Sequence, residues 1–243
     1  MTGTFALAQR LSEEGAHLDP GARERISGYL DLLTQWNRKT NLVGPRDPET
    51  IFETLIVDSL QLGPFLDSLG LPDQPLCLDL GAGAGLPGIP LRCFWQRGEY
   101  HLVEVREKRC VFMRLAVGRL KLPCTHVLQG RAEDALASLA GSGGSERLEV
   151  EKRRVGQDAG AEQRALRADL ILSRAFMPWQ ELLPFVRPML AAGGRVVVLA
   201  NEAAPDNPPA SWKMVACTSY GVRHGEDAAE RWFWALRRED GLG

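Results

Sequence analysis

A glycine-rich turn at residues 78–90 directly follows a short apolar segment and sets narrow limits on the fold. The turn reads Leu-Asp-Leu-Gly-Ala-Gly-Ala-Gly-Leu-Pro-Gly-Ile-Pro. Glycine adopts positive φ without strain and lets a ligand approach the bare backbone. In open α/β sheets, such a turn opens a nucleotide site at the carboxyl ends of the strands. The sequence therefore predicts an α/β fold with a ligand site at this edge.

Short apolar segments alternate with helical patterns through the rest of the chain. Strands are expected near 76–80, 100–104, 124–129, 169–173 and 194–200, and helices near 87–96, 106–121, 131–139 and 179–190. Repeated βα units produce a parallel sheet with right-handed crossovers and helices on both faces. Two closely spaced strands at 212–218 and 231–237, separated by a polar loop, predict a terminal β-hairpin.

Two helices are expected ahead of the sheet. Asp19-Pro20 and Asp47-Pro48 each combine a capping side chain with a proline at the first helical position. They predict a helical extension over residues 1–72, followed by the main domain over 73–243. Within that domain, residues 141–167 contain Gly-Ser-Gly-Gly-Ser and lack an apolar period, which predicts a mobile surface insertion.

Composition excludes several classes of protein. The chain of 243 residues has 44% hydrophobic and 25% charged residues, and no segment reaches the roughly 18 apolar residues of a membrane span. Its five cysteines are scattered and form no Cys-x-x-Cys pair, which argues against a disulfide framework or a zinc site. We therefore expect a cytoplasmic protein with buried free thiols and no bound metal, and we take a monomer as the default.

Residues 92–131 carry a concentration of positive charge. This segment holds nine basic and three acidic side chains, a local net charge of +6, although the whole chain has a formal charge of −2. The basic residues are Arg92, Arg97, Arg106, Lys108, Arg109, Arg114, Arg119, Lys121 and Arg131. They predict either a nucleic-acid surface, since phosphate contacts supply affinity independent of sequence, or a solvated helix face.

Two ligand chemistries compete for the glycine-rich turn. Gly83, Gly85 and Gly88 satisfy Gly-x-Gly-x-x-Gly, which is typical of dinucleotide-dependent oxidoreductases. Against that interpretation, Asp79 is a poor neighbour for a pyrophosphate, and Pro87 and Pro90 stand where free backbone N–H groups would be useful. A carboxylate suits a ligand with positive charge, such as the ammonium and sulfonium of S-adenosylmethionine.

Polar residues follow the later strands at the same edge. Glu104 ends the second strand, where its carboxylate can accept hydrogen bonds from both hydroxyls of a ribose. Arg131-Ala132-Glu133 follows the third strand, where the small Ala132 would admit the edge of a base, although a helix start explains the triplet equally well. Arg174 ends the fourth strand, and its desolvation favours a role at the site. Beyond it, Phe176 or Trp179 would offer a stacking platform for a base, although core packing is the more usual role of such aromatics.

These residues, taken together, resemble those of the small-subunit ribosomal RNA methyltransferase G family, also called glucose-inhibited division protein B. The resemblance rests on Asn41-Leu42-Val43, Asp58-Ser59-Leu60, residues 79–90, Lys108-Arg109, Arg131-Ala132-Glu133 and Ser173-Arg174-Ala175. It implies a seven-stranded, Rossmann-like S-adenosylmethionine-dependent methyltransferase fold. The implied reaction is methylation of a guanine N7 in 16S rRNA of the small ribosomal subunit.

The resemblance also implies roles for residues. The expected cofactor-binding residues are Asp79, Gly81, Gly83, Leu86, Glu104, Ala132, Glu133 and Arg174. Asn41, Lys108 and Arg109 are expected nearer the RNA, and Asn41 and Arg174 are candidates in a reaction that depends on positioning. Leu55 and Ala200 stand where the family usually has His and Lys, so an alternative is an RNA- or ribosome-binding module of this fold without turnover.

Overall fold

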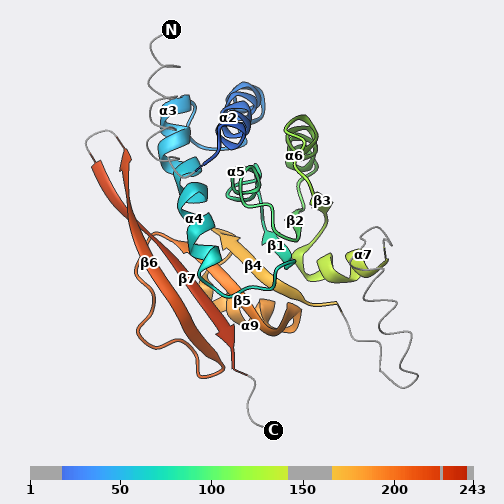
Figure 1. Cartoon of the computed structure of the whole chain (residues 1–243), viewed down its shortest axis with the longest axis vertical. Helices are drawn as coiled ribbons and strands as arrows, with labels where there is room; N and C mark the ends of the chain where they lie inside the picture. Colours follow the sequence, from blue (N-terminus) through green and yellow to red (C-terminus); the bar gives the residue numbers. More distant parts are fainter. Residues whose placement is uncertain (1–17, 142–165, 225–226, 240–243) are drawn as a thin grey trace.

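The computed structural model describes residues 18–141, 166–224 and 227–239, and its centre is a seven-stranded sheet (Figure 1). The strand order is β3-β2-β1-β4-β5-β7-β6. The strands are β1 (Leu76–Leu80), β2 (Glu99–Glu104), β3 (Thr125–Gln129), β4 (Ala168–Arg174), β5 (Leu190–Ala200), β6 (Trp212–His224) and β7 (Asp227–Arg238). Strands β1 to β5 pair in parallel, and β7 is antiparallel to its neighbours β5 and β6. The predicted α/β class, the Rossmann-like sheet and the terminal hairpin are confirmed.

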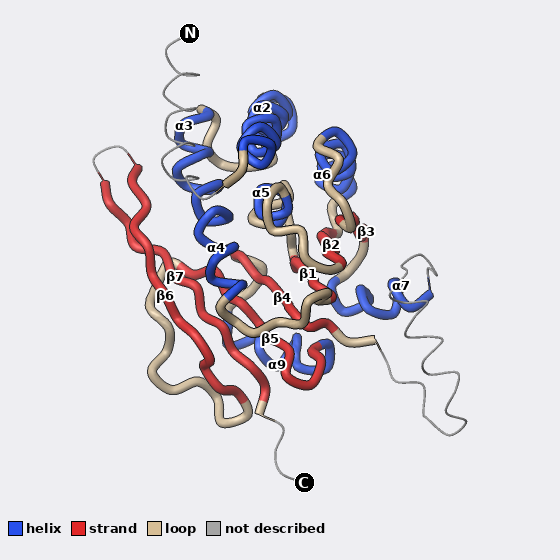
Figure 2. Tube along the Cα trace, in the orientation of Figure 1, coloured by secondary structure: helices blue, strands red, loops and turns tan. Residues whose placement is uncertain are grey.

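Helices cover both faces of the sheet (Figures 1 and 2). The helices are α2 (Pro20–Thr40), α3 (Pro48–Ile51), α4 (Val57–Asp67), α5 (Gly88–Arg92), α6 (Glu107–Arg119), α7 (Ala135–Gly141) and α9 (Trp179–Val186). Helices α2 to α6 bury their apolar side chains in one hydrophobic cluster, and α7 and α9 bury theirs in a second. Neighbouring residues of β1 belong to different clusters, Cys77 to the first and Leu78 to the second. This alternation is what a sheet covered on both faces requires.

Both predicted helix starts of the N-terminal extension are confirmed. A side-chain oxygen of Asp19 accepts a 2.8 Å hydrogen bond from the Ala22 amide, and Asp47 does the same for Thr50. Between α3 and α4 the helix widens into a π-helical segment, Phe52–Ile56. The extension shares its hydrophobic cluster with the first face of the sheet, and the division of the chain at residue 72 remains a prediction.

Several expected boundaries were wrong. The expected helix over 87–96 is only α5, because Arg92 donates hydrogen bonds to the carbonyls of Trp95 and Arg97 and so holds the following segment in turns. Strand β5 begins at Leu190 instead of 194, with an irregular register against β4 before the paired residues Leu170 and Arg195.

The hairpin is longer than expected. The strands were placed at 212–218 and 231–237, yet the polar segment between them pairs in register from Ser219 with Trp232 to His224 with Asp227. The polar composition of this segment therefore belongs to paired strands and not to a loop. Most of the predicted mobile insertion, residues 142–165, lies outside the described residues.

The basic segment is not all surface. Arg92 is fully buried and donates to Thr125 Oγ1 and to the carbonyls of five residues, Trp95, Arg97, Gly98, Pro123 and Cys124. Arg97 pairs with Asp67 at 3.3 Å and donates to the carbonyls of Leu71 and Pro72. Both arginines stabilise the fold. Because Arg92 is fully buried, it can line neither a nucleic-acid surface nor a solvated helix face, so both expected alternatives were wrong for this residue.

The expectation for the cysteines was only partly correct. Each of the five cysteines, all within the described residues, is a free thiol, but Cys124 and Cys217 are exposed and not buried as expected. No helix within the described residues is long and apolar enough to cross a membrane. Nor does that part of the chain contain a group of three or more His, Cys, Asp or Glu side chains placed to hold a metal ion.

Candidate functional site

A cavity of about 230 Å³ lies at the carboxyl ends of β1 to β4, at the predicted edge of the sheet. The lining residues belong to the end of β2 or come from the segments that follow β1, β2, β3 and β4. The lining residues are Gly81, Val103, Glu104, Val105, Arg106, Arg109, Gly130, Ala132, Ala175 and Phe176. Three of the expected cofactor residues, Gly81, Glu104 and Ala132, therefore meet at one cavity although they belong to three separate βα units.

The glycine-rich turn forms one wall of this cavity. Gly81 has φ of +67°, and a Cβ added there would lie 2.6 Å from the ring of Phe176. Only glycine fits both the backbone conformation and the close approach of the ring. The turn is held in place by hydrogen bonds from the Ala82 amide to the Val103 carbonyl and from the Gly85 amide to the Ala82 carbonyl.

Glu104 is the most heavily bonded acceptor at the cavity. Its Oε2 accepts hydrogen bonds from the Gly83 amide at 3.1 Å and from Arg109 Nη1 at 3.3 Å. Its Oε1 accepts one from the Arg106 amide at 3.0 Å. The Glu104 side chain is only 5% exposed and that of Arg109 is 27% exposed. Arg109, expected nearer the RNA, is thus also a cavity residue.

Asp79 lies beneath the turn and not among the residues that line the cavity. It is fully enclosed, and its Oδ2 accepts a 3.1 Å hydrogen bond from the Tyr100 hydroxyl. Burial raises the pKa of the Asp79 carboxyl to about 7, against the opposing effects of hydrogen bonds from Tyr100 and the Gly88 backbone. Leu86 is likewise buried, and its side chain packs in the cluster beneath α5.

Arg174 connects the end of β4 to the N-terminal extension. Its Nη2 lies 3.0 Å from Asp58 Oδ2 and donates to the Thr54 carbonyl at 3.2 Å. Asp58 also accepts a 2.7 Å hydrogen bond from Tyr220 on β6. Thr54 belongs to the π-helical segment, a local distortion that is frequent at functional sites. The sequence did not indicate Tyr220, because its partner lies far away in the chain.

The other expected site residues lie outside the cavity lining. Glu133 is 48% exposed and pairs with Arg131 at 3.2 Å on the surface. Asn41 ends α2 in the left-handed conformation, is exposed and accepts a 3.3 Å hydrogen bond from Arg46. Lys108 is exposed on the first turn of α6.

Of the two aromatic candidates for a stacking platform, only Phe176 lines the cavity. Its ring also packs against Phe185 with centroids 5.9 Å apart. Trp179 packs edge-on against the buried Trp234, with centroids 6.3 Å apart, and belongs to the second hydrophobic cluster. The site therefore offers Phe176 as its aromatic surface, and Trp179 supports the core.

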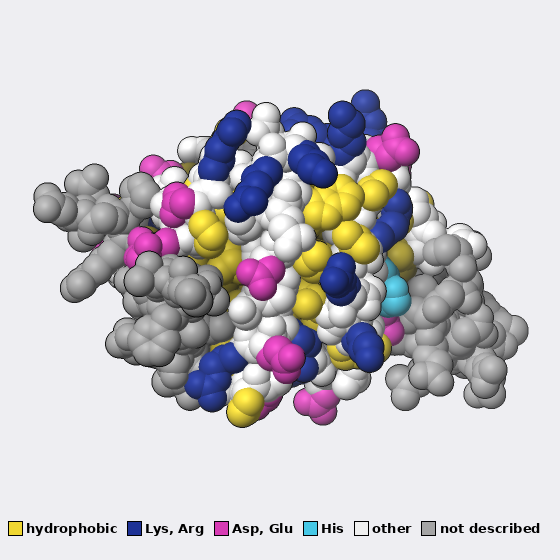
Figure 3. Space-filling view, turned by 90° about the horizontal axis from the view of Figure 1, so that it is seen from above, with side chains coloured by type: hydrophobic (Ala, Val, Ile, Leu, Met, Phe, Trp, Pro, Cys, Tyr) yellow, Lys and Arg dark blue, Asp and Glu magenta, His cyan; other side chains and the backbone are white. Residues whose placement is uncertain are grey.

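A basic surface extends from the rim of the cavity along α6. Figure 3 shows the face at the top of Figure 1, where Lys and Arg side chains are spread among apolar and acidic ones. Exposed basic residues of α2, α6 and the turn after α6 are Arg38, Lys39, Lys108, Arg114, Arg119 and Lys121. The apolar side chains of Val111 and Leu115 are exposed on α6 between them. Such a surface suits nucleic-acid binding, since phosphates pair with the cations.

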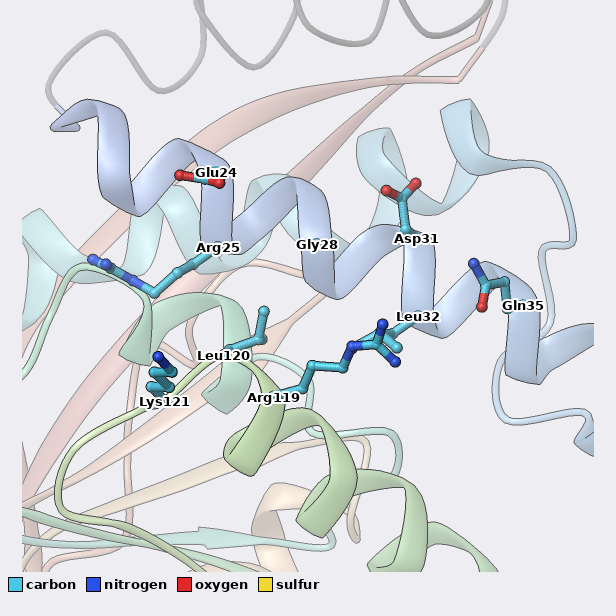
Figure 4. A pocket seen from close by; sticks show the side chains of 9 residues that line it. All are labelled: Glu24, Arg25, Gly28, Asp31, Leu32, Gln35, Arg119, Leu120 and Lys121. Carbon is cyan, nitrogen blue, oxygen red and sulfur yellow. The ribbon is translucent and has the colours of Figure 1, made fainter.

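A second pocket lies between α2 and the end of α6 (Figure 4). Arg119, Lys121 and Arg25 line it together with the acidic Glu24 and Asp31. Arg25 already donates to the Cys93 carbonyl through Nε and Nη2. The mixed charge and the prior engagement of Arg25 make this pocket a poor anion site, so the cavity at the sheet edge is the stronger candidate.

Comparison with known proteins shows which sequence family this chain resembles. A sequence model of the family described as "rRNA small subunit methyltransferase G" matches residues 22–141. A protein named ribosomal RNA small subunit methyltransferase G from Nitratidesulfovibrio vulgaris is 48% identical over 225 residues, covering 93% of this chain and 89% of the relative. A protein of the same name from Oleidesulfovibrio alaskensis is 41% identical over 234 residues, covering 92% and 89%.

A solved structure supports the fold. The structure described as "MtNAS in complex with MTA and tNA" superposes with a TM-score of 0.52 at 9% sequence identity, covering 90% of this chain and 70% of that one. At this identity the likeness concerns the arrangement of helices and strands alone.

Proposed function

Since this chain belongs to the rRNA small subunit methyltransferase G family, we propose that it transfers a methyl group from S-adenosylmethionine to N7 of a guanine in 16S rRNA. Methylation of small-subunit rRNA is the activity that its relatives' names state. The N7 position rests on the resemblance to this family, and the fit of the cavity to a nucleoside supports S-adenosylmethionine as the cofactor. The single observation that carries the proposal is the convergence of Gly81, Glu104 and Ala132 on one cavity.

The residues at this cavity fit a nucleoside cofactor. Gly81 offers a wall without a Cβ, Glu104 offers a carboxylate to ribose hydroxyls, and Ala132 offers a small side chain beside a base. When bound, S-adenosylmethionine supplies a methyl group carried on a sulfonium. The buried Asp79 and the Gly83 amide contribute indirectly. Asp79 accepts hydrogen bonds from the Tyr100 hydroxyl and from the backbone of Gly88 in the turn, and the Gly83 amide donates to Glu104 and orients it.

The chemistry at N7 makes few demands on the protein. Guanine N7 has an exposed lone pair and carries no proton at neutral pH, so no general base has to remove one before the methyl group is transferred. Among the described residues that line the cavity there is no histidine, which is consistent with this route. What the protein supplies is orientation and exclusion of water, effects that contribute on the order of 7–11 kcal/mol in well-oriented systems.

RNA would reach the cavity along the basic surface of α6. This helix starts directly after Glu104 and Arg106, so Lys108 and Arg109 stand between the cofactor cavity and the exposed cations further along. We assign Lys108 and Arg109 to phosphate contacts and Asn41 to the RNA side, and we assign Arg174 to positioning. Phe176 supplies a face on which an extruded base stacks.

The test is methyl transfer to a defined nucleoside. Purified protein and S-adenosylmethionine labelled in the methyl group are incubated with small ribosomal subunits that lack the modification, and the rRNA is digested and analysed by nucleoside mass. Label in 7-methylguanosine is the expected result. Label in another nucleoside would refute the N7 assignment, and binding of subunits without transfer would indicate a module that has lost turnover, as Leu55 and Ala200 suggest.

A matched pair of variants on β2 tests the site. Glu104→Gln removes the carboxylate at the cavity and is expected to abolish S-adenosylhomocysteine binding in calorimetry. Glu99→Gln removes one at the other end of the same strand, where Glu99 pairs with His126 at 2.8 Å, and should leave binding unchanged. Equal binding by both variants would remove Glu104 from the proposed cofactor site.

A further inference from the structure

We propose that Arg109 couples cofactor binding to RNA binding by leaving Glu104 when the cofactor's ribose occupies that carboxylate. The inference rests on the proposed function, because it needs a cofactor with a ribose diol and an RNA substrate. It assigns Arg109 two successive partners, the Glu104 carboxylate in the free protein and an RNA phosphate in the loaded one.

The hydrogen bonds of Glu104 carry the first step. An ionised carboxylate has about four lone-pair positions. The described residues already fill three of them, through the amides of Gly83 and Arg106 and through Arg109 Nη1. A ribose diol that donates two hydrogen bonds would need two positions, so one of the present donors has to leave.

Arg109 is the donor that is able to move. The Gly83 amide belongs to the turn, and the Arg106 amide belongs to the backbone at the start of α6. The Arg109 guanidinium stands at the end of a long, flexible side chain, is 27% exposed, and is bound to Glu104 at the longest of the three distances, 3.3 Å. It also lines the cavity, which its departure would enlarge.

The position of Arg109 on α6 supplies the second step. Arg109 belongs to the first turn of α6, beside the exposed Lys108 and ahead of Arg114 on the basic surface. A guanidinium released from a carboxylate at this rim gains full capacity for bidentate binding of phosphate. Cofactor binding therefore adds one cation to the RNA surface, and by linkage RNA binding tightens the cofactor to the same degree.

The experiment measures binding of small ribosomal subunits that lack the modification, with and without saturating S-adenosylhomocysteine, over a range of salt concentrations. For the unaltered chain we expect S-adenosylhomocysteine to tighten subunit binding about fivefold or more. We also expect the slope of log K against log salt to steepen by about 0.7–0.9, the contribution of one additional phosphate contact.

Two variants separate the proposal from a general loss of charge. Arg109→Gln should bind subunits with the same affinity and salt slope in both states, while calorimetry shows that it binds S-adenosylhomocysteine at least as tightly as the unaltered chain. Lys108→Gln removes one positive charge from the neighbouring residue, and the Lys108 side chain is not bonded to Glu104. It should weaken subunit binding in both states and keep the fivefold response to the cofactor.

The outcomes distinguish this proposal from the proposed function. If Arg109→Gln retains the full response, or if S-adenosylhomocysteine has no effect on subunit binding by the unaltered chain, the coupling role of Arg109 is overturned while methyl transfer stands. If the unaltered chain does not bind S-adenosylhomocysteine at all, both proposals fall. A circular-dichroism melt of each variant confirms that the fold is retained.

Discussion

Tyr220 donates a 2.7 Å hydrogen bond to Asp58, although 162 residues separate them in the chain. The same carboxylate pairs with Arg174 at 3.0 Å. One buried acid thus joins the terminal hairpin, the N-terminal extension and the end of β4 beside the cavity. Because the Asp58 side chain is only 4% exposed, water has little access to Tyr220 and Arg174 and would not take over the hydrogen bonds that they make with Asp58.

Asp58→Asn is expected to lower the free energy of unfolding by about 3 kcal/mol, because it leaves the Arg174 charge uncompensated where that side chain is 19% exposed. Urea unfolding measures the change. The exposed Arg131–Glu133 pair provides the control, and Glu133→Gln should leave the unfolding midpoint unchanged. A midpoint for Asp58→Asn equal to that of the unaltered chain would mean that the network contributes no stability.

The acidity of Asp79 predicts how stability depends on pH. Burial raises the pKa of this carboxyl to about 7 in the folded protein, whereas an unfolded chain has a value near 3.9. Between these values the folded state holds a proton that the unfolded state has lost. The contribution of Asp79 is therefore fully present below about pH 4 and is lost as pH rises to about 7, at up to roughly 1.4 kcal/mol per pH unit.

Asp79→Asn should remove this dependence, since an amide does not titrate. Urea unfolding at pH 5, 6, 7 and 8 compares the two proteins, and the stability of the variant relative to the unaltered chain should rise between pH 5 and 7. Parallel curves across that range would show that Asp79 is ionised in the folded protein over the whole range.

A glycine of the cavity wall, Gly81, and a glycine of α6, Gly118, form a matched pair that tests the packing of the wall. Gly81→Ala combines a φ of +67° with a Cβ 2.6 Å from Phe176, so we expect it to weaken S-adenosylhomocysteine binding at least tenfold and to cost about 1–2 kcal/mol of stability. Gly118→Ala lies in α6, where a Cβ would meet nothing within 4 Å. It should stabilise the protein by about 0.5–1 kcal/mol and leave binding intact. Calorimetry and thermal melts report both effects.

Local sequence order accounts for what could be predicted. Glu104 and Ala132 were found because Glu104 ends β2 and Ala132 lies three residues after β3, and parallel strands bring their carboxyl ends to one edge. The pairs Arg109–Glu104 and Tyr220–Asp58 depend on side-chain directions and tertiary packing, which periodicity does not encode. The hairpin was predicted at the correct place but too short, because the polar, glycine-containing segment between the expected strands has the composition of a loop although its residues pair.

Arg92 shows most directly why charge counting misled. In the sequence it is one of nine basic residues between 92 and 131. In the structure it is fully buried and donates to Thr125 and to five backbone carbonyls. The planar guanidinium of arginine can serve this set of acceptors, whereas the three donors of a lysine ammonium cannot. Arg92→Lys is therefore expected to cost on the order of 3 kcal/mol despite the retained charge.

Arg119→Lys is the matched control, since Arg119 is exposed at the end of α6. It should leave the free energy of unfolding unchanged within about 0.5 kcal/mol. Urea unfolding of the two variants decides between a structural and a surface role, because a surface cation tolerates lysine and a buried hydrogen-bonding hub does not. Equal stability of both variants would mean that the hydrogen bonds of Arg92 do not stabilise the fold.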